Sequence, residues 1–315
     1  MKPVIKKHEG LIAAPFTPLD PKGNLNIEMI PVYYRFLEKN GITGAFVNGT
    51  TGEGPSLTQK EKQINAREWA KCMNSGGKVE IINLVGGTSY KECIENAIFS
   101  KEIGISAVAV MGPYFFRPCS EEALAEYVAV IGESVQDMPV YYYHFPAITG
   151  VNIKMTAFLK KISVMLPNFS GIKFTHEDLM DFISCINFNG GTYDILWGRD
   201  ECMLSALATG CKGFVGSTYN YAAPLYHSLM EAFRKGNVER AQNLQLKAVE
   251  MISLLDKYGG IATGKAFMKY IGIDCGHFRL PVKNMSPEMY EEFRKDVEKL
   301  NIKEFLSRND EAFPG

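Results

Sequence analysis

The sequence lacks the features that mark membrane, secreted and nucleic-acid-binding proteins. None of its apolar runs approaches the roughly 18 residues that a transmembrane helix needs. With 34 basic and 35 acidic residues, the formal net charge is −1, which gives no electrostatic footprint for nucleic acid or an anionic membrane. The basic N-terminal stretch meets Pro15 and Pro18 too soon to contain a signal-peptide core. We therefore expect a soluble, cytoplasmic protein that acts on small molecules and binds neither membranes nor nucleic acids.

Cysteine pairs at short spacing are also lacking. The seven cysteines are odd in number, and no C-x-x-C occurs among them. This pattern argues against a disulfide framework and against a cysteine-rich zinc site. His144 has no companion histidine or acid cluster at metal-ligand spacing. We therefore expect no metal, and a chain of this length can bury a core large enough to fold without one.

Short apolar runs, bounded by Gly or Pro and rich in β-branched or aromatic residues, recur along most of the chain. They do not alternate apolar with polar, which is typical of strands buried on both faces. We expect strands over 10–15, 44–48, 79–85, 106–110, 139–144, 169–174, 193–198 and 213–217. Stretches of helical period, such as 61–73 and 89–104, separate them. This alternation predicts an α/β fold, a (β/α)₈ TIM barrel, and the lack of G-x-G-x-x-G after an early strand disfavours a doubly wound sheet.

The pattern changes after about residue 232, where strands stop. Amphipathic helices are expected over 236–259, 262–272 and 286–302. Ser286 and Pro287 are typical of the first residues of the last helix. We therefore divide the chain into a barrel over 1–232, which carries the active site, and a C-terminal three-helix extension over 233–315 packed on it.

Active sites of such barrels lie where the strands end, so the polar residues at these positions are the candidates. The second strand runs into Gly49-Thr50-Thr51, where free backbone N–H groups could hold a carboxylate or a phosphate. A plain strand-to-helix turn has the same composition. The fifth strand ends in Tyr143, which alternation places on the opposite face from His144. Tyr143 could act in the site or simply pack, and we interpret His144 as structural.

The sixth strand carries Lys173 inside an apolar run. Lysine is almost never fully buried unless it has a partner or a role. Desolvation lowers the pKa of a lysine, and the neutral amine attacks carbonyl groups to form a Schiff base. A lysine that reaches the barrel rim through its aliphatic stem is the alternative.

Acidic residues follow the seventh strand, and a hydroxyl follows the eighth. Asp200 and Glu201 could cap the next helix. Together with Ser217 they could instead bind several hydroxyls of a sugar.

In this order, GTTGE at 49–53, a tyrosine at the end of the fifth strand and GIK at 171–173 resemble the class I pyruvate-dependent aldolases. The resemblance runs from Gly10 to at least Asn220, and the helical tail also suits it. YYYHFPAITG, GIKFTHED, WGRDE and VGSTYNY are most similar to the branch that cleaves sialic acid, above all its animal members. In the synthase branch an arginine that holds a second carboxylate usually stands where this chain has Ile148.

The resemblance implies that Lys173 forms a Schiff base with the keto carbon of open-chain sialic acid. Tyr143 would act with the substrate carboxylate to move the proton between the C4 hydroxyl and the leaving aldehyde. Reversible retro-aldol cleavage would give pyruvate and N-acetylmannosamine, with the protonated imine as electron sink and no metal or cofactor. The implied substrate-binding residues are Gly49, Thr50 and Thr51 for the carboxylate, and Thr175, Gly198, Asp200, Glu201 and Ser217 for the hydroxyls.

Two other functions stay open at this point. The chain could be another Schiff-base aldolase, such as a 2-keto-3-deoxy-sugar aldolase or a dihydrodipicolinate synthase. It could also be a non-catalytic barrel that binds a sugar or pyruvate, although such a sensor need not keep Lys173, Tyr143 and the Thr50-Thr51 pair together.

Tyr114, Phe115 and Phe116 follow the fourth strand directly. Neighbours on an extended segment face opposite ways, so three consecutive rings cannot all enter one core. We expect a subunit contact here, and the resemblance implies a homotetramer. Phe115 stands where bacterial relatives place a tyrosine that reaches a neighbouring subunit's site, and it has no hydroxyl for that role. The alternative is that Arg117-Pro118 folds the loop back and hides the rings.

Overall fold

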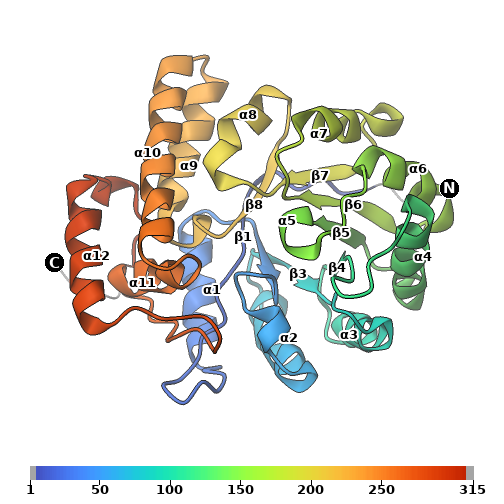
Figure 1. The fold of residues 1–315 in the computed structure, drawn as a ribbon, viewed down its shortest axis with the longest axis horizontal. Coiled ribbons are helices and arrows are strands. Elements are labelled where there is room, and N and C mark those ends of the chain that lie inside the picture. Colours follow the sequence, from blue (N-terminus) through green and yellow to red (C-terminus); the bar gives the residue numbers. More distant parts are fainter. Residues whose placement is uncertain (1–4, 310–315) are drawn as a thin grey trace.

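The computed structural model describes residues 5–309, and its centre is a closed barrel of parallel strands (Figure 1). Strands pair in sequence order, and β1 pairs with β8 to complete the ring. The strands are β1 (Gly10–Ala13), β2 (Gly44–Val47), β3 (Glu80–Leu84), β4 (Ala107–Met111), β5 (Val140–His144), β6 (Phe169–Phe174), β7 (Asp194–Trp197) and β8 (Gly213–Gly216). The predicted (β/α)₈ barrel is confirmed, with each strand within two residues of its expected bounds.

Helices cover the outside of the barrel. They are α1 (Met29–Lys39), α2 (Gln59–Asn74), α3 (Tyr90–Glu102), α4 (Glu121–Gly132), α5 (Pro146–Thr149), α6 (Met155–Met165), α7 (Leu179–Ile186), α8 (Met203–Ala208) and α9 (Tyr219–Arg234). Local sequence explains several of their starts. Thr58 and Glu61 form a capping box at α2, and the Ser120 side chain accepts a hydrogen bond from the Ala123 N–H at α4.

Buried apolar residues form two clusters, one between the strands and the helices and one inside the barrel. The inner cluster includes Phe46, Tyr141, Tyr143 and Leu196, whereas Tyr142 belongs to the outer one. The alternation expected for the fifth strand is therefore present, and it directs Tyr143 into the barrel.

The C-terminal extension consists of α10 (Val238–Lys257), α11 (Ala262–Tyr270) and α12 (Pro287–Lys299). Figure 1 shows α10 beside α9 and α12 at the edge of the molecule. The Tyr221 ring of α9 stacks on Phe267 of α11 with ring centroids 4.5 Å apart, so extension and barrel share one core. Within residues 5–309, no helix is long and apolar enough to cross a membrane.

The N-terminal end of the barrel is closed by a charged cluster. His8 Nδ1 lies 2.8 Å from Asp194 Oδ2, which also accepts a hydrogen bond of 2.9 Å from the Tyr141 hydroxyl. His8 Nε2 lies 3.5 Å from Glu80 Oε2. Burial by itself lowers the pKa of His8, but hydrogen bonds to the two carboxylates outweigh it and raise that pKa to about 9.

Candidate active site

Lys173 lies in the middle of the barrel, on β6 between Tyr143 of β5 and Leu196 of β7. Its residue surface is only 4% exposed. The ammonium nitrogen lies 4.1 Å from the ring centroids of both Phe46 and Tyr143. The position is therefore interior, and the alternative of a lysine that reaches the rim is not what the structure shows.

Burial determines the chemistry of this amine. Desolvation lowers the pKa of Lys173 to about 7, although the charge of Asp200 opposes the shift. The lowered pKa favours the neutral amine, which is the form that attacks a carbonyl carbon.

Tyr143 lies beside this amine and contacts the loop after β2. Its hydroxyl oxygen is 3.3 Å from Thr50 Oγ1. Burial raises the pKa of Tyr143 to about 12, while its contacts with the Thr50 and Thr175 hydroxyls act the other way. The phenol is therefore protonated at neutral pH and can pass a proton to or from a group bound next to Lys173.

The loop after β2 is tightly folded around its glycines. Asn48 and Glu53 have left-handed φ angles of 58° and 57°. The Gly54 N–H donates to Gly49 O over 3.1 Å, and a Cβ at Gly54 would come within 2.0 Å of Asn48 O. Thr51 is buried. The loop is therefore fixed, with Thr50 aimed at Tyr143.

Buried side-chain amides hold the start of this loop through hydrogen bonds. Asn48 Nδ2 donates to Asn83 Oδ1 over 2.8 Å, and Asn65 Nδ2 donates to Asn48 Oδ1 over 2.8 Å. Asn83 in turn donates to the Ser100 hydroxyl over 2.9 Å. These residues could not be identified from the sequence, because single asparagines in a strand or a helix carry no local signal.

Asp200 is buried, begins a short 3₁₀ turn after β7 and interacts electrostatically with Lys173. Its Oδ2 accepts hydrogen bonds from the Thr218 N–H over 3.0 Å and from the Thr218 hydroxyl over 2.6 Å. Burial raises the pKa of Asp200 to about 6, against these bonds and the charge of Lys173. A Cβ at Gly216 would lie 1.9 Å from Asp200 Oδ1, so only glycine leaves room for the carboxylate.

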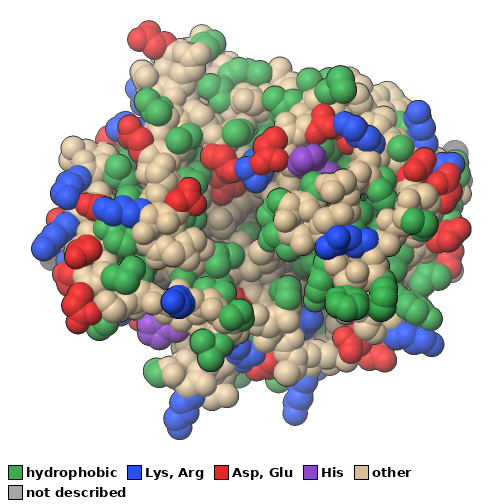
Figure 2. Space-filling view, in the orientation of Figure 1, with side chains coloured by type: hydrophobic (Ala, Val, Ile, Leu, Met, Phe, Trp, Pro, Cys, Tyr) green, Lys and Arg blue, Asp and Glu red, His purple; other side chains and the backbone are tan. Residues whose placement is uncertain are grey.

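The remaining candidates lie around this centre. Thr175 is buried at the end of β6, and a Cβ at Gly198 would approach its hydroxyl to 2.0 Å. Glu201 and Ser217 are partly exposed, and Glu201 forms an ion pair with Arg199, in which Oε1 and Nε lie 2.9 Å apart. Figure 2 shows the molecule hollowed near its middle, with acidic and basic side chains at the rim of the hollow.

His144 points away from the barrel interior, as expected from the alternation along β5. It packs against Phe174 with ring centroids 5.0 Å apart. Burial lowers the pKa of His144 to about 3, so the ring is neutral. No group of three or more metal-ligating side chains occurs between residues 5 and 309.

The three aromatic residues after β4 are exposed in the single chain. Phe115 is 75% and Phe116 is 84% exposed, and the two rings meet edge to face at 5.0 Å. Arg117 Nε donates to Thr149 O over 3.0 Å without covering them. The loop does not hide these rings within one chain.

Taken together, the centre of the barrel combines a partly neutral amine, a protonated phenol and a loop of hydroxyl and N–H donors. An amine in this state attacks a carbonyl carbon, the donors suit an adjacent carboxylate, and the phenol suits proton transfer. The arrangement therefore fits imine chemistry on a 2-keto acid.

Comparisons with known proteins agree with this chemistry. The model of the dihydrodipicolinate synthetase family matches residues 7–300. The N-acetylneuraminate lyase of Gallus gallus is 38% identical over 299 residues, which cover 94% of this chain and 97% of that protein. The N-acetylneuraminate lyase of Homo sapiens is 36% identical over 309 residues, 97% and 96% of the two chains. Among solved structures, Proteus mirabilis N-acetylneuraminate lyase is similar with a TM-score of 0.91 and 37% identity, covering 94% of this chain and 99% of that one.

Proposed function

We propose that this chain, which belongs to the dihydrodipicolinate synthetase family, cleaves N-acetylneuraminate reversibly into pyruvate and N-acetylmannosamine. The observation that carries the proposal is the buried Lys173 amine, 4.1 Å from the ring centroid of Tyr143, whose hydroxyl contacts Thr50. Curated N-acetylneuraminate lyases that are 36–38% identical over nearly the whole chain support the choice of substrate.

The reaction begins when Lys173 Nζ attacks the keto carbon of the open-chain sugar acid. Water leaves and a protonated imine forms. The C3–C4 bond then breaks, its electron pair moves toward the imine as an enamine, and the C4 oxygen becomes the aldehyde of N-acetylmannosamine. Proton addition at C3 and hydrolysis of the imine release pyruvate and restore the amine.

Tyr143 moves the proton that the C4 hydroxyl loses. Because the pKa of about 12 disfavours a free phenolate, the phenol accepts the proton from the C4 hydroxyl in the same step in which it passes its own proton to the substrate carboxylate. Thr50 Oγ1, at 3.3 Å, keeps the phenolic oxygen in place. Thr50, Thr51 and the backbone at Gly49 hold the substrate carboxylate.

The sugar hydroxyls would meet the polar residues after β6, β7 and β8. Glu201 and Ser217 are partly exposed, so the glycerol-like tail would contact them. Asp200, Thr175 and Gly198 line the inner part. The protonated imine serves as the electron sink, so the proposal needs no metal or cofactor, and activity that survives dialysis against a chelator would support this.

The direct test is release of pyruvate from N-acetylneuraminate by the purified protein, measured through a coupled reaction that consumes NADH. The runner-up is condensation of pyruvate with aspartate semialdehyde. Ile148 is 50% exposed and apolar, so it cannot pair with a second carboxylate. Efficient condensation with no cleavage of N-acetylneuraminate would reverse the ranking.

We also propose that the protein is a cytoplasmic homotetramer. The free thiols of all seven cysteines fit a reducing compartment, and the exposed Phe115 and Phe116 rings suit a subunit contact. Light scattering at micromolar concentration should report a tetramer, and Phe115→Asp should weaken it and lower activity. A fully active monomer would refute the assembly.

A further inference from the structure

The loop that carries Thr50 is held in place by a buried ion pair with the C-terminal extension. Glu53 Oε1 accepts a hydrogen bond of 2.8 Å from Lys265 Nζ, although 212 positions separate the two residues. Both side chains are 3% exposed. Removal of one partner of such a buried pair strongly destabilises the folded protein, because the other charge is left buried without compensation.

Glu53 is tied to the substrate loop as well as to the extension. Its backbone N–H donates to Thr50 O over 3.1 Å, and its φ is left-handed. Its second carboxylate oxygen accepts from the Arg279 N–H over 2.8 Å. Both carboxylate oxygens of Glu53 are therefore bound by residues of the extension.

Arg279 also holds the segment that follows the loop. Its Nη1 donates to Ser56 O over 3.0 Å and contacts Glu61 Oε2 at 3.0 Å. The same Glu61 oxygen accepts from the Thr58 N–H at the start of α2. The hydrogen bonds and charge of Arg279 lower the pKa of Glu61 to about 2. The extension thus binds the loop at Glu53 and also binds the chain at the start of α2.

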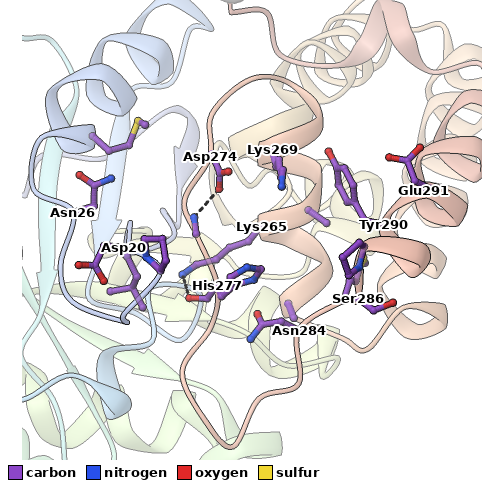
Figure 3. A pocket seen from close by; sticks show the side chains of 18 residues that line it. Asp20, Asn26, Lys265, Lys269, Asp274, His277, Asn284, Ser286, Tyr290 and Glu291 are labelled. Atoms are coloured by element: carbon purple, nitrogen blue, oxygen red, sulfur yellow. Dashed lines mark hydrogen bonds between the residues drawn. The ribbon is translucent and has the colours of Figure 1, made fainter.

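The Lys265 ammonium has two further contacts within the extension. It donates to His277 O over 3.0 Å, and it lies 4.7 Å from the centroid of the Phe278 ring. Figure 3 shows Lys265 reaching from α11 to the segment of His277, beside a cavity of about 910 Å³ between this extension and residues 19–29. A Cβ at Gly264 would come within 2.3 Å of the Phe16 ring, which shows how closely α11 packs. Lys265 therefore joins the loop to the extension through an ion pair in which both side chains are buried.

We propose that Lys265 and Arg279 form a clamp that positions the Gly49–Gly54 loop for the substrate carboxylate, which makes Lys265 a positioning residue. The proposal rests on the function proposed above. Without the Lys265 charge, Glu53 would leave its site and carry Thr50 with it. Binding of the carboxylate should then weaken, whereas the Lys173 amine on β6 should keep its reactivity.

The test compares two carbonyl compounds in borohydride trapping at Lys173, mapped by peptide mass spectrometry. Pyruvate carries the carboxylate that the loop would bind, and acetaldehyde lacks it. In each case the amine forms an imine with loss of water, and hydride reduces it to a secondary amine. In Lys265→Met the pyruvate concentration needed for half-maximal trapping should rise about tenfold or more, while acetaldehyde trapping stays within about twofold of wild type.

Lys269→Met is the matched control, because Lys269 is exposed on the same helix and lines the same cavity. Lys265→Arg keeps the cation and should restore part of the pyruvate affinity. If Lys265→Met does not fold, Glu53→Gln/Lys265→Met removes both charges, and the same selective loss for pyruvate is expected. Thermal unfolding of each variant shows whether it is folded.

Equal loss of pyruvate and acetaldehyde trapping, or unchanged pyruvate affinity in a folded variant, would overturn the clamp. Wild-type protein that fails to trap pyruvate at Lys173 would instead refute the proposed function, and with it the clamp. If the wild-type protein traps pyruvate at Lys173 and the folded variants trap it at the same pyruvate concentration, the clamp alone is refuted.

Discussion

Removal of one oxygen atom from Tyr143 tests the proposed proton transfer with little disturbance of the fold. In Tyr143→Phe the ring keeps its two contacts. Its centroid lies 5.4 Å from the centroid of Phe46 and 4.1 Å from Lys173 Nζ. The substitution removes the 3.3 Å contact between the Tyr143 hydroxyl and Thr50 Oγ1. The net contribution of one hydrogen bond to the free energy of unfolding is about 1 kcal/mol. The variant should therefore fold with nearly unchanged thermal stability.

Its turnover should fall far more than its stability. A positioned acid–base group contributes roughly 10²–10⁴-fold to the rate, which corresponds to about 3–5 kcal/mol in the activation barrier. Pyruvate release from N-acetylneuraminate measures the loss, and borohydride trapping of pyruvate at Lys173 should persist because the amine is intact. The matched control is Tyr142→Phe, which changes a buried tyrosine on the other face of the same strand. Turnover of Tyr143→Phe within threefold of wild type would refute this role.

Three further outcomes follow from the charges and the close packing of the barrel. Because the pKa of Lys173 is lowered to about 7, its amine is protonated in acid, and kcat/KM should fall as the pH drops below about 7. The pKa of His8 is raised to about 9 in the folded state, so its contribution of about 3 kcal/mol is complete below pH about 6.5 and should be lost as the pH rises through 9, as followed by urea unfolding. Gly216→Ala should destabilise the fold by about 1–3 kcal/mol and lower activity, because the added methyl would collide with the Asp200 carboxylate at 1.9 Å.

Each of these outcomes has its own control. A pH–rate profile with no acid limb near 7 would contradict the environment of Lys173. His8→Gln should flatten the alkaline loss of stability, and a variant with the same loss would show that another group titrates. Gly87→Ala is the control for Gly216→Ala, since no atom lies within 4 Å of the added methyl and its φ is not left-handed.

The barrel could be predicted from the sequence because its strands are buried on both faces. Mainly apolar runs such as 79–85 and 169–174 are a local signal, and β3 and β6 occupy them. Strand ends were less well defined. The first run was expected to reach residue 15, but β1 ends at Ala13, after which Ala14 N still donates to Gly216 O over 2.9 Å.

Lys173 and Tyr143 could be identified as candidates from the strand pattern, and their catalytic roles stay predictions. A charged residue in an apolar run needs an explanation, and alternation places Tyr143 on the same face as Tyr141 and on the opposite face from His144. Asp200 was a candidate for the sugar hydroxyls, but its bonds to Thr218 and its proximity to Gly216 depend on how β7 and β8 lie together.

The support beneath the site could not be predicted, because it joins residues that are far apart in the sequence. Nothing near Glu53 indicates that its partner is Lys265, and nothing near Lys265 distinguishes it from the exposed Lys269 on the same helix. His8 likewise meets Asp194 only when the ring of strands closes. Such contacts follow from topology and not from local periodicity.

The most direct test of the account is to incubate the protein with N-acetylneuraminate, reduce it with borohydride and map the modified peptide. The buried amine beside Tyr143 predicts a three-carbon adduct derived from pyruvate on Lys173, together with release of N-acetylmannosamine. An adduct on Lys154 or Lys265, or no adduct while cleavage proceeds, would contradict the Schiff-base mechanism.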